Sequence, residues 1–560
     1  MPSDRPAVPR LRLPRLPAWR SRLPAFVREA ANRWLRRDWR GALDQPGPGA
    51  GPSGPWLVQG WVVPPGRIGA VGVRLTVRAL AADGRLLAQR ELPLSEAWMP
   101  RPDVARLMGD ARTARCGFAL WLAGPRRGPA ARLEVQARVG ESGAPGWRGA
   151  VDLVGGGDPP GDPVAGFEES RLDLVGFHGG GFGLGRAVDG TAQMLSAVGW
   201  RVQRQPADAP PRSAAAGVVV AQINPDVLPA WLAVAGDRAW PPRRIAYVTW
   251  ELPVLPPGWI QALSAWATEL WAPSRFVAEA LRSAGAVLSR LPLHIVPHAL
   301  PGPDVDPDGG ARWTWPERAR HPGPRLLCLF DHDSDAGRKG VLDSIALARA
   351  LARARPRSRP LLVVKRQGAA RHPAAAGQVA EALHRAAADL DACLLDGRWP
   401  GPALAGLVAG CDVLLSMHRS EGFGLVLAEA IVAGRSVLAG GGGGSGELLA
   451  MAGLEPVPGR PEAVARRPAA LAGPYLPGPG ALWDRPDRRI ATRRLLDLVD
   501  RPETARAHAL AAAARLRARL CPWALARALP AELRPPGRAA QPPPGCGSRC
   551  CCQNSIAAAS

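Results

Sequence analysis

The stretch HRSEGFGLVLAEA, residues 418–430, decides the fold of this chain. It sets Glu421 and Glu429 eight positions apart, on either side of a glycine-bracketed phenylalanine. The preceding run DVLLSM is largely apolar, as a buried parallel strand is, and the following run GLVLAEAIVAG predicts a helix. Strand, loop and helix in this order are the unit of a doubly wound α/β sheet, whose ligands bind beyond the carboxyl ends of the strands.

The loop between this strand and this helix has the chemistry of an anion site. Gly422 and Gly424 allow the backbone to approach a ligand closely. A helix that begins near Leu425 turns its unpaired N–H groups and its positive dipole end toward the loop. A diphosphate suits such a place, with the main-chain N–H groups around Phe423, Gly424 and Leu425 as donors.

The two glutamates fit different parts of the same ligand. Glu429, in the early turns of the helix, can accept hydrogen bonds from two adjacent hydroxyls, and ribose carries such a pair. Glu421, in the loop, would face the other end of the ligand. The alternative, which the two residues favour when taken without their surroundings, is that Glu429 caps a helix and that Glu421 is a solvated loop acid.

The same pattern of strand, loop and helix is repeated along the chain, which indicates two Rossmann-like domains in tandem. Before them, runs such as ARLEVQARV alternate apolar and polar residues, and Asp83-Gly84 between two runs signals a hairpin, so a small all-β sandwich is expected. The predicted organisation is a basic segment and linker at 1–50, the sandwich at 51–158, Rossmann-like domains at 165–302 and 322–520, and a disordered tail at 521–560.

Composition limits the partners. The chain has 560 residues and a formal net charge of +23, and its only lysines are Lys339 and Lys365. The arginine excess has two interpretations, a compositional bias or attraction to an anionic membrane surface. No nucleic-acid-binding motif accompanies it, so no nucleic-acid partner is expected. A short basic amphipathic helix is possible from Ala25. It would either lie in a membrane interface or be an ordinary surface helix or frayed tail.

The location is predicted from absences in the sequence. No run of about 18 apolar residues is present and no apolar signal segment starts the chain, so neither a membrane span nor secretion is expected. Five of the nine cysteines are scattered singly, which fits a reducing cytoplasm, and the crowded tail cysteines do not suit a zinc site. We expect a cytoplasmic protein, peripheral on the inner face of the plasma membrane if the basic segment binds lipid.

Several motifs together resemble one family. They are GGGFGLGRAVDG, YVTWELP, ELWAPSRFVAEAL, HIVPHAL, FDHDSDAGRKG, LLVVKRQ and MHRSEGFGLVLAEAIVAG. The last contains a Glu-x7-Glu pattern and resembles that of the retaining family 4 glycosyltransferases, which have two facing Rossmann-like domains, the GT-B fold. The resemblance covers about residues 170–515. It implies that Glu429 holds the ribose of a nucleotide-sugar donor and that Glu421 contacts the transferred sugar or supports its developing positive charge.

Basic residues complete the predicted donor site. Lys339, beside Arg338, and Lys365 follow consecutive strands and should lie over the same crevice. Cations there would stabilise a nucleoside-diphosphate leaving group, so no metal and no cofactor are expected. Ordinary surface or strand-end lysines are the alternatives.

The acceptor side is less clear. Trp250-Glu251 stands where many relatives carry a histidine–acid pair, and Glu251 either binds the acceptor hydroxyl or is a loop carboxylate. Gly181, Gly183 and Gly185 would form an acceptor or phosphate loop. Ser445, Gly446 and Glu447 replace an Asn or Asp often found near the donor sugar, which leaves the sugar specificity open.

The sequence therefore predicts a retaining glycosyltransferase that moves a sugar from a nucleotide-sugar donor to a hydroxyl of a glycan or lipid-linked acceptor. A sugar-nucleotide-binding or scaffold protein of glycan assembly without turnover is the alternative. A sugar-nucleotide epimerase is a third hypothesis, against which the Glu-x7-Glu stretch argues. The β-sandwich predicted at 51–158 resembles an accessory β-domain found beside bacterial sugar-modifying enzymes.

Overall fold

The computed structural model describes residues 39–45, 56–64, 72–94, 98–99, 116–122, 129–139, 146–153, 168–178, 183–207, 216–225, 227–228, 231, 241–300, 323–464 and 481–535. The chain divides into two compact units, Met1–Gly155 and Gly156–Ser560. The predicted basic amphipathic helix and the cysteine-rich end of the tail lie outside the described residues.

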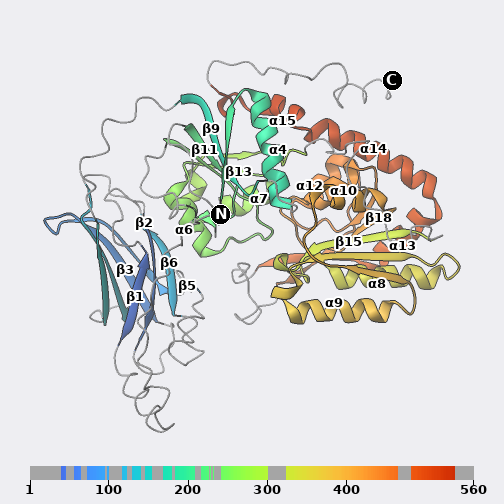
Figure 1. The fold of residues 1–560 in the computed structure, drawn as a ribbon, viewed down its shortest axis with the longest axis horizontal. Coiled ribbons are helices and arrows are strands. Elements are labelled where there is room, and N and C mark those ends of the chain that lie inside the picture. The colour runs from blue at the N-terminus through green and yellow to red at the C-terminus, as the bar shows by residue number, and fades with distance from the viewer. Residues whose placement is uncertain are drawn as a thin grey trace, which may run out of the picture. The chain divides into compact units, whose positions relative to one another are not determined.

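The first unit is a pair of four-stranded antiparallel sheets (Figure 1). One sheet has the order β1-β2-β6-β5 and the other β4-β3-β7-β8. The strands are β1 Arg40–Gln45, β2 Trp56–Val63, β3 Val73–Leu80, β4 Leu86–Pro93, β5 Trp98–Met99, β6 Gly117–Leu122, β7 Arg132–Val139 and β8 Trp147–Asp152. Gly84 has a φ of +82° in the turn between β3 and β4, which confirms the predicted hairpin.

Alternation builds the core of this unit. Val73, Leu75 and Val77 of β3 are buried on one face, while Arg74 and Arg78 between them pair with side chains on the outer face. The inward side chains of both sheets form one apolar cluster. The prediction of an all-β sandwich is therefore confirmed.

The second unit begins with a six-stranded sheet whose strands are all parallel, in the order β10-β9-β11-β12-β13-β14. Its strands are β9 Glu168–Gly176, β10 Arg201–Pro206, β11 Ala216–Ala221, β12 Arg243–Tyr247, β13 Glu269–Ala272 and β14 Leu293–Ile295. Its helices are α4 Gly183–Val198, α6 Pro257–Trp266, α7 Arg275–Arg282 and the 3-10 turn η3 Leu288–Arg290. Strand β11 is apolar throughout, as expected of a central strand whose sheet is covered by helices on both faces.

A second parallel sheet follows, in the order β17-β16-β15-β18-β19. Its strands are β15 Arg325–Asp331, β16 Leu361–Gln367, β17 Asp391–Leu395, β18 Val413–Ser416 and β19 Ser436–Ala439, and the small hairpin β20 Gly459–Ala463 with β21 Leu482–Pro486 lies outside it. The helices are α8 Val341–Ala354, α9 Pro373–Ala386, α10 Gly401–Gly410, α11 Leu425–Val432 and α12 Ser445–Ala452, with 3-10 turns η5 His332–Ser334 and η6 Ala369–Arg371. The two predicted Rossmann-like domains are both present.

The C-terminal helices link the two Rossmann-like domains. They are α13 Arg488–Asp500, α14 Pro502–Leu520, α15 Pro522–Ala528 and the turn η7 Ala531–Leu533. Helix α14 packs on α11 and α12. Helix α15 packs on α4, as Figure 1 shows. The backbone N–H of Leu300 donates to the carbonyl of Leu520 at 2.8 Å, and Trp200 Nε1 donates to the carbonyl of Leu533 at 3.1 Å.

This arrangement corrects one prediction. The tail after residue 520 was expected to be disordered, but residues 521–535 are folded. The reason is burial, because Leu525, Ala526, Leu529 and Leu533 belong to the same apolar cluster as α4 and α14. That cluster contains side chains of both Rossmann-like domains, so their carboxyl-end loops are held close to each other.

Candidate active site

A cavity of about 260 Å³ opens where loops of the two Rossmann-like domains meet. The first domain contributes side chains that follow its strands, and the second contributes the carboxyl ends of β15, β16 and β18 with the start of α11. The polar residues of its lining are Arg186, Asn224, Thr249, Glu251, His298, Asp331, Ser334, Lys339, Lys365, Gln367, Ser416, Glu421 and Glu429. This is the place where ligands bind in open parallel sheets.

The loop between β18 and α11 lies as the sequence predicted. Gly424 precedes α11 with a φ of +94°, a left-handed conformation that favours glycine, and Leu425 is the first helical residue. A Cβ on Gly422 would lie 2.5 Å from the carbonyl oxygen of Trp250, so only glycine allows this contact between the two domains. Gly422, Phe423, Gly424 and Leu425 all line the cavity. The helix therefore presents its N-terminus to the cavity.

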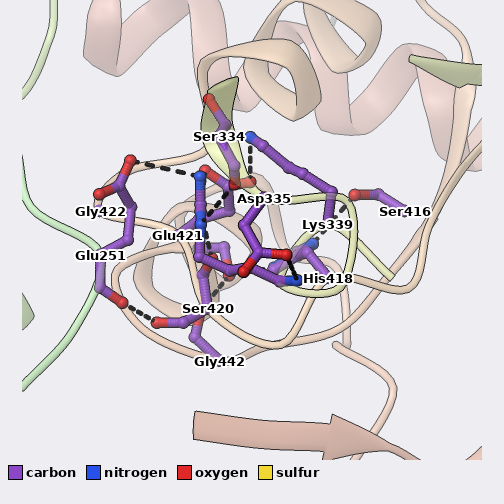
Figure 2. A network of polar contacts seen from close by, with 12 residues as sticks. Glu251, Ser334, Asp335, Lys339, Ser416, His418, Ser420, Glu421, Gly422 and Gly442 are labelled. Atoms are coloured by element: carbon purple, nitrogen blue, oxygen red, sulfur yellow. Dashed lines mark hydrogen bonds and ion pairs between the residues drawn. The ribbon is translucent and has the colours of Figure 1, made fainter. Parts of the chain in front are cut away.

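Glu421 lies in a cluster of positive charge, drawn in Figure 2. Lys339 Nζ donates to Glu421 Oε1 at 2.5 Å, and Arg338 Nη1 lies 3.4 Å from Glu421 Oε2. Burial alone would raise the pKa of Glu421, but Lys339 and then Arg338 outweigh it and bring that pKa to about 2. The carboxylate is therefore ionised throughout the physiological range.

Arg338 joins carboxylates of both domains. Its Nη2 lies 3.4 Å from Glu251 Oε1, its Nη1 donates to the carbonyl of Ser420 at 2.7 Å, and only 2% of its side chain is exposed. Ser420 also donates its hydroxyl to the carbonyl of Glu251 (Figure 2). The structure thus brings Glu251, Lys339 and Glu421 together in the lining of the cavity, although they come from three distant parts of the sequence. Arg338 does not line the cavity but lies behind the two carboxylates, so a direct contact with a donor stays a prediction for it.

Glu429 faces the first domain. Arg186 Nη1 of α4 lies 3.0 Å from Glu429 Oε1, and 14% of the Glu429 side chain is exposed. Burial raises the pKa of Glu429, and the positive charge of Arg186 opposes that rise. Arg186 was not predicted from the sequence, although its place three residues after Gly183 in a glycine-rich helix start is a signal that could have found it.

Lys365 lines the cavity but has partners of its own. Its Nζ donates to the carbonyl of Gly397 at 2.6 Å and to that of Arg366 at 3.3 Å, and it lies 5.6 Å from the centre of the Trp399 ring. Burial lowers the pKa of this ammonium group, against the charges of Asp396 and Asp331. These contacts tie the end of β16 to the loop after β17, and a contact with a donor stays a prediction.

The glycine-rich segment 439–449 has a structural explanation. Ser445 is buried, shares a 2.7 Å hydrogen bond with His418 Nε2 and donates to the carbonyl of Gly442 at 2.9 Å. Glu447 accepts hydrogen bonds from the backbone N–H groups of Arg275 and Phe276, each at 3.0 Å. Glu447 therefore caps helix α7 of the other domain, a role that no local sequence signal could have shown.

The predicted glycine loop is placed only in part. Gly181 lies outside the described residues, while Gly183 and Gly185 belong to the first turn of α4. A Cβ on Gly183 would lie 3.6 Å from Leu425 Cδ1, so α4 and α11 begin opposite each other. The sequence reasoning also missed Asn224 and Thr249, which line the cavity after β11 and β12.

Neither a metal-binding cluster nor a membrane-spanning helix is found among the described residues. Within the described ranges, no group of three or more His, Cys, Asp or Glu side chains is arranged to hold a metal ion. No helix in the part of the chain that the structure describes is long and apolar enough to cross a bilayer.

Comparisons with known proteins found one matching family model and a set of solved structures. Residues 281–529 match the family model described as Family 4 Glycosyltransferase in conflict systems. Among solved structures, sucrose-phosphate synthase from Thermosynechococcus elongatus is 16% identical, with 64% of this chain and 96% of that chain covered and a TM-score of 0.43. A glycosyltransferase from Rickettsia africae is 13% identical, with 64% and 96% covered and a TM-score of 0.42.

HepE from Anabaena, solved in complex with UDP, is 14% identical, with 64% of this chain and 97% of that chain covered and a TM-score of 0.38. No curated protein sequence is significantly similar to the chain. The structural similarities are too low to transfer a substrate or a residue role. The family match and the two parallel sheets point the same way: residues 281–529 are similar to the family 4 glycosyltransferases, and the chain is a glycosyltransferase of the GT-B fold with an antiparallel β-sandwich ahead of it in sequence.

Proposed function

We propose that the protein transfers a sugar, with retention of configuration, from a nucleotide-sugar donor to a hydroxyl of a glycan or lipid-linked acceptor. The observation that carries this proposal is the convergence of Lys339 and the N-terminus of α11 on one cavity, with the buried Arg338 behind Glu421. Cations and exposed amides stabilise the charge that builds on a diphosphate leaving group. Glu429, one turn into the same helix, lies where ribose hydroxyls would reach.

The same geometry supports roles for the two other acids. Glu421 is ionised beside the cations, so its negative charge can stabilise positive charge that develops on the transferred sugar. Glu251 comes from the first domain and lines the cavity, where it would accept a hydrogen bond from the acceptor hydroxyl. We assign no protein nucleophile. The basic cluster would neutralise the leaving group without a metal ion, and peripheral binding to an anionic membrane stays a prediction.

The test is nucleotide release from a panel of UDP-, GDP-, ADP- and dTDP-sugars, with and without glycan acceptors. The wild type should release nucleoside diphosphate, and Glu421→Gln should reduce kcat by about a hundredfold or more because it removes the charge at the reacting centre. Glu381→Gln is the matched control, since Glu381 forms an exposed ion pair with Arg385 on α9. NMR of the product anomer tests retention.

Other outcomes would contradict the proposal. Binding of a nucleotide sugar with no release under any acceptor condition would identify a non-catalytic binding protein. Conversion of one nucleotide sugar into another would identify an epimerase. Equal activity of Glu421→Gln and the wild type would place the chemistry elsewhere.

A further inference from the structure

We infer that Arg186 is a positioning residue for the donor: it orients the Glu429 carboxylate from the opposite domain and thereby sets how strongly the cavity holds the ribose hydroxyls of a nucleotide. This inference rests on the proposed function, in which Glu429 contacts that ribose. It adds a residue of the first domain to a donor site that the sequence places in the second domain.

The geometry that carries it is the pairing of two helix starts. Gly183 of α4 faces Leu425 of α11, with a Cβ-to-Cδ1 separation of 3.6 Å if a side chain were added at Gly183. One turn further along each helix, Arg186 Nη1 lies 3.0 Å from Glu429 Oε1. Residues three or four apart lie on the same side of a helix, so both pairs point toward the same cavity.

The Arg186 side chain is also part of the cavity wall and is not buried behind it. Its side chain keeps 28% of its surface exposed, and both Arg186 and Glu429 line the cavity. Holding one carboxylate oxygen by a charged donor fixes the direction of the other oxygen. The ion pair therefore orients the acceptor that would meet two vicinal hydroxyls.

Protonation links this pair to binding strength. An ionised carboxylate accepts hydrogen bonds at both oxygens, whereas a protonated one must donate from one of them. Burial raises the pKa of Glu429, and Arg186 is the charge that opposes this rise. The other charged groups of the cavity are Glu251, Asp331, Lys339, Lys365 and Glu421. In the described residues, the ion pair of Glu429 is made with Arg186 and not with any of these cations.

The experiment compares ribose recognition in four proteins: the wild type, Arg186→Gln, Arg186→Lys and Arg204→Gln. Arg204→Gln is the control. Arg204, on β10, pairs with Asp189 of α4, the helix that carries Arg186, but Arg204 does not line the cavity. Calorimetry measures the Kd of UDP and GDP, and of their 2′,3′-dideoxy forms, at pH 6, 7 and 8. The readout is the ratio of the dideoxy Kd to the ribose Kd, which does not depend on the folded fraction of a variant.

The wild type should favour the ribose form of the nucleotide it binds by about tenfold or more, with little change over this pH range. Arg186→Gln should lose most of that preference, with the loss greatest at pH 6 because Glu429 then protonates more readily. Arg186→Lys keeps the positive charge beside Glu429, so its ribose preference should change as little with pH as that of the wild type. Arg204→Gln should match the wild type.

The outcomes separate this inference from the proposed function. If the wild type binds nucleotide and turns over a nucleotide sugar while Arg186→Gln keeps the full ribose preference at every pH, the inference about Arg186 is wrong and the proposed function stands. If no nucleoside diphosphate binds to the wild type and no nucleotide sugar is turned over, the proposed function itself is wrong.

Discussion

At the scale of single residues, the site is an arrangement of opposite charges that are buried together. Lys339 and Arg338 keep the Glu421 carboxylate ionised at a position where burial by itself raises its pKa. The ammonium group of Lys339 lines the cavity beside Glu421, so it can also donate to a diphosphate and stabilise the negative charge that builds on that group as it leaves. This makes Lys339 the residue whose loss should show most clearly in turnover.

Lys339→Met should lower kcat by about 100- to 1000-fold with a smaller change in KM, because leaving-group charge grows mainly in the transition state. Steady-state kinetics with the active nucleotide sugar measure both constants. Arg385→Met, on the exposed ion pair of α9, is the control. A variant of Lys339 that changed KM and left kcat intact would mean that this lysine binds the donor without assisting departure.

Two buried histidines give the protein a predictable response to acid. His298 shares a hydrogen bond of 2.9 Å with the Tyr247 hydroxyl, and His418 lies between the hydroxyls of Ser416 and Ser445. Burial lowers the pKa of His298 to about 3 and that of His418 to about 4. Unfolded histidine titrates near pH 6.5, so below that pH the unfolded chain binds more protons than the folded one.

The free energy of unfolding should therefore fall as the pH drops from 6.5 toward 4, by about 2 kcal/mol for each of the two histidines between pH 7 and pH 5. Urea denaturation at both values measures it. His418→Gln should show a shallower pH dependence than the wild type. An unchanged slope in His418→Gln would show that His418 is protonated in the folded protein.

At the scale of elements, the site depends on turns that only glycine can form. Gly340 ends the turn that carries Arg338 and Lys339, with a φ of +63°, and a Cβ there would lie 1.7 Å from the carbonyl oxygen of Met417. The turn before α8 thus lies directly against the end of β18. This contact brings the cations to Glu421.

Gly340→Ala should destabilise the protein by at least about 3 kcal/mol, because backbone atoms on both sides must move and the φ is unfavourable for alanine. Gly377→Ala is the control inside α9, where a Cβ would meet nothing within 4 Å. That substitution should stabilise the helix by up to about 1 kcal/mol. Thermal unfolding of the two variants checks both signs, and a stable, active Gly340→Ala would refute the described turn.

The sequence predicted elements well where their patterns were long. Apolar runs located β15, β16 and β18, and alternation located β3 and β7. It did not reveal β17, whose five residues are all only half-buried and carry no pattern, or the hairpin of β20 and β21. The folded helix α15 was missed because its short apolar set acquires meaning only against α4, which lies more than 300 residues earlier.

The residues of the site also fall into those that local sequence patterns predict and those that they do not. Glu421, Glu429 and the glycines between them share one motif, so the sequence could place them together. Lys339 was predicted from its position after a strand. Arg186 and Glu447 act through contacts with the other domain, and such contacts depend on how the two domains face each other, which no local pattern encodes.

At the scale of the whole molecule, the second unit is held together by contacts between its two Rossmann-like domains. Ser274 donates its hydroxyl to the carbonyl of Gly422 at 2.7 Å, and Glu447 caps the start of α7. The same residues adjoin the loop that faces the cavity. Donor binding and the relative position of the two domains should therefore be coupled.

Glu447→Gln tests the contact between the two domains on which this coupling depends. A glutamine has one acceptor oxygen and an amide that cannot face a second N–H, so the cap should weaken by about 1 kcal/mol. Hydrogen exchange at Arg275 and Phe276 should become about five times faster, while Glu503→Gln at the start of α14 should leave those amides unchanged. Unchanged exchange in Glu447→Gln would mean that the two domains do not meet in this way in solution.

The central claim is that one cavity holds the diphosphate on the α11 N-terminus and Lys339 while Glu429 holds the ribose. A crystal structure of the protein with UDP or GDP tests it most directly. We predict diphosphate oxygens within about 3.2 Å of Lys339 Nζ and of the N–H groups of Phe423, Gly424 or Leu425, with both ribose hydroxyls on Glu429. A nucleotide bound outside this cavity, or bound in it with its ribose away from Glu429, would contradict the account.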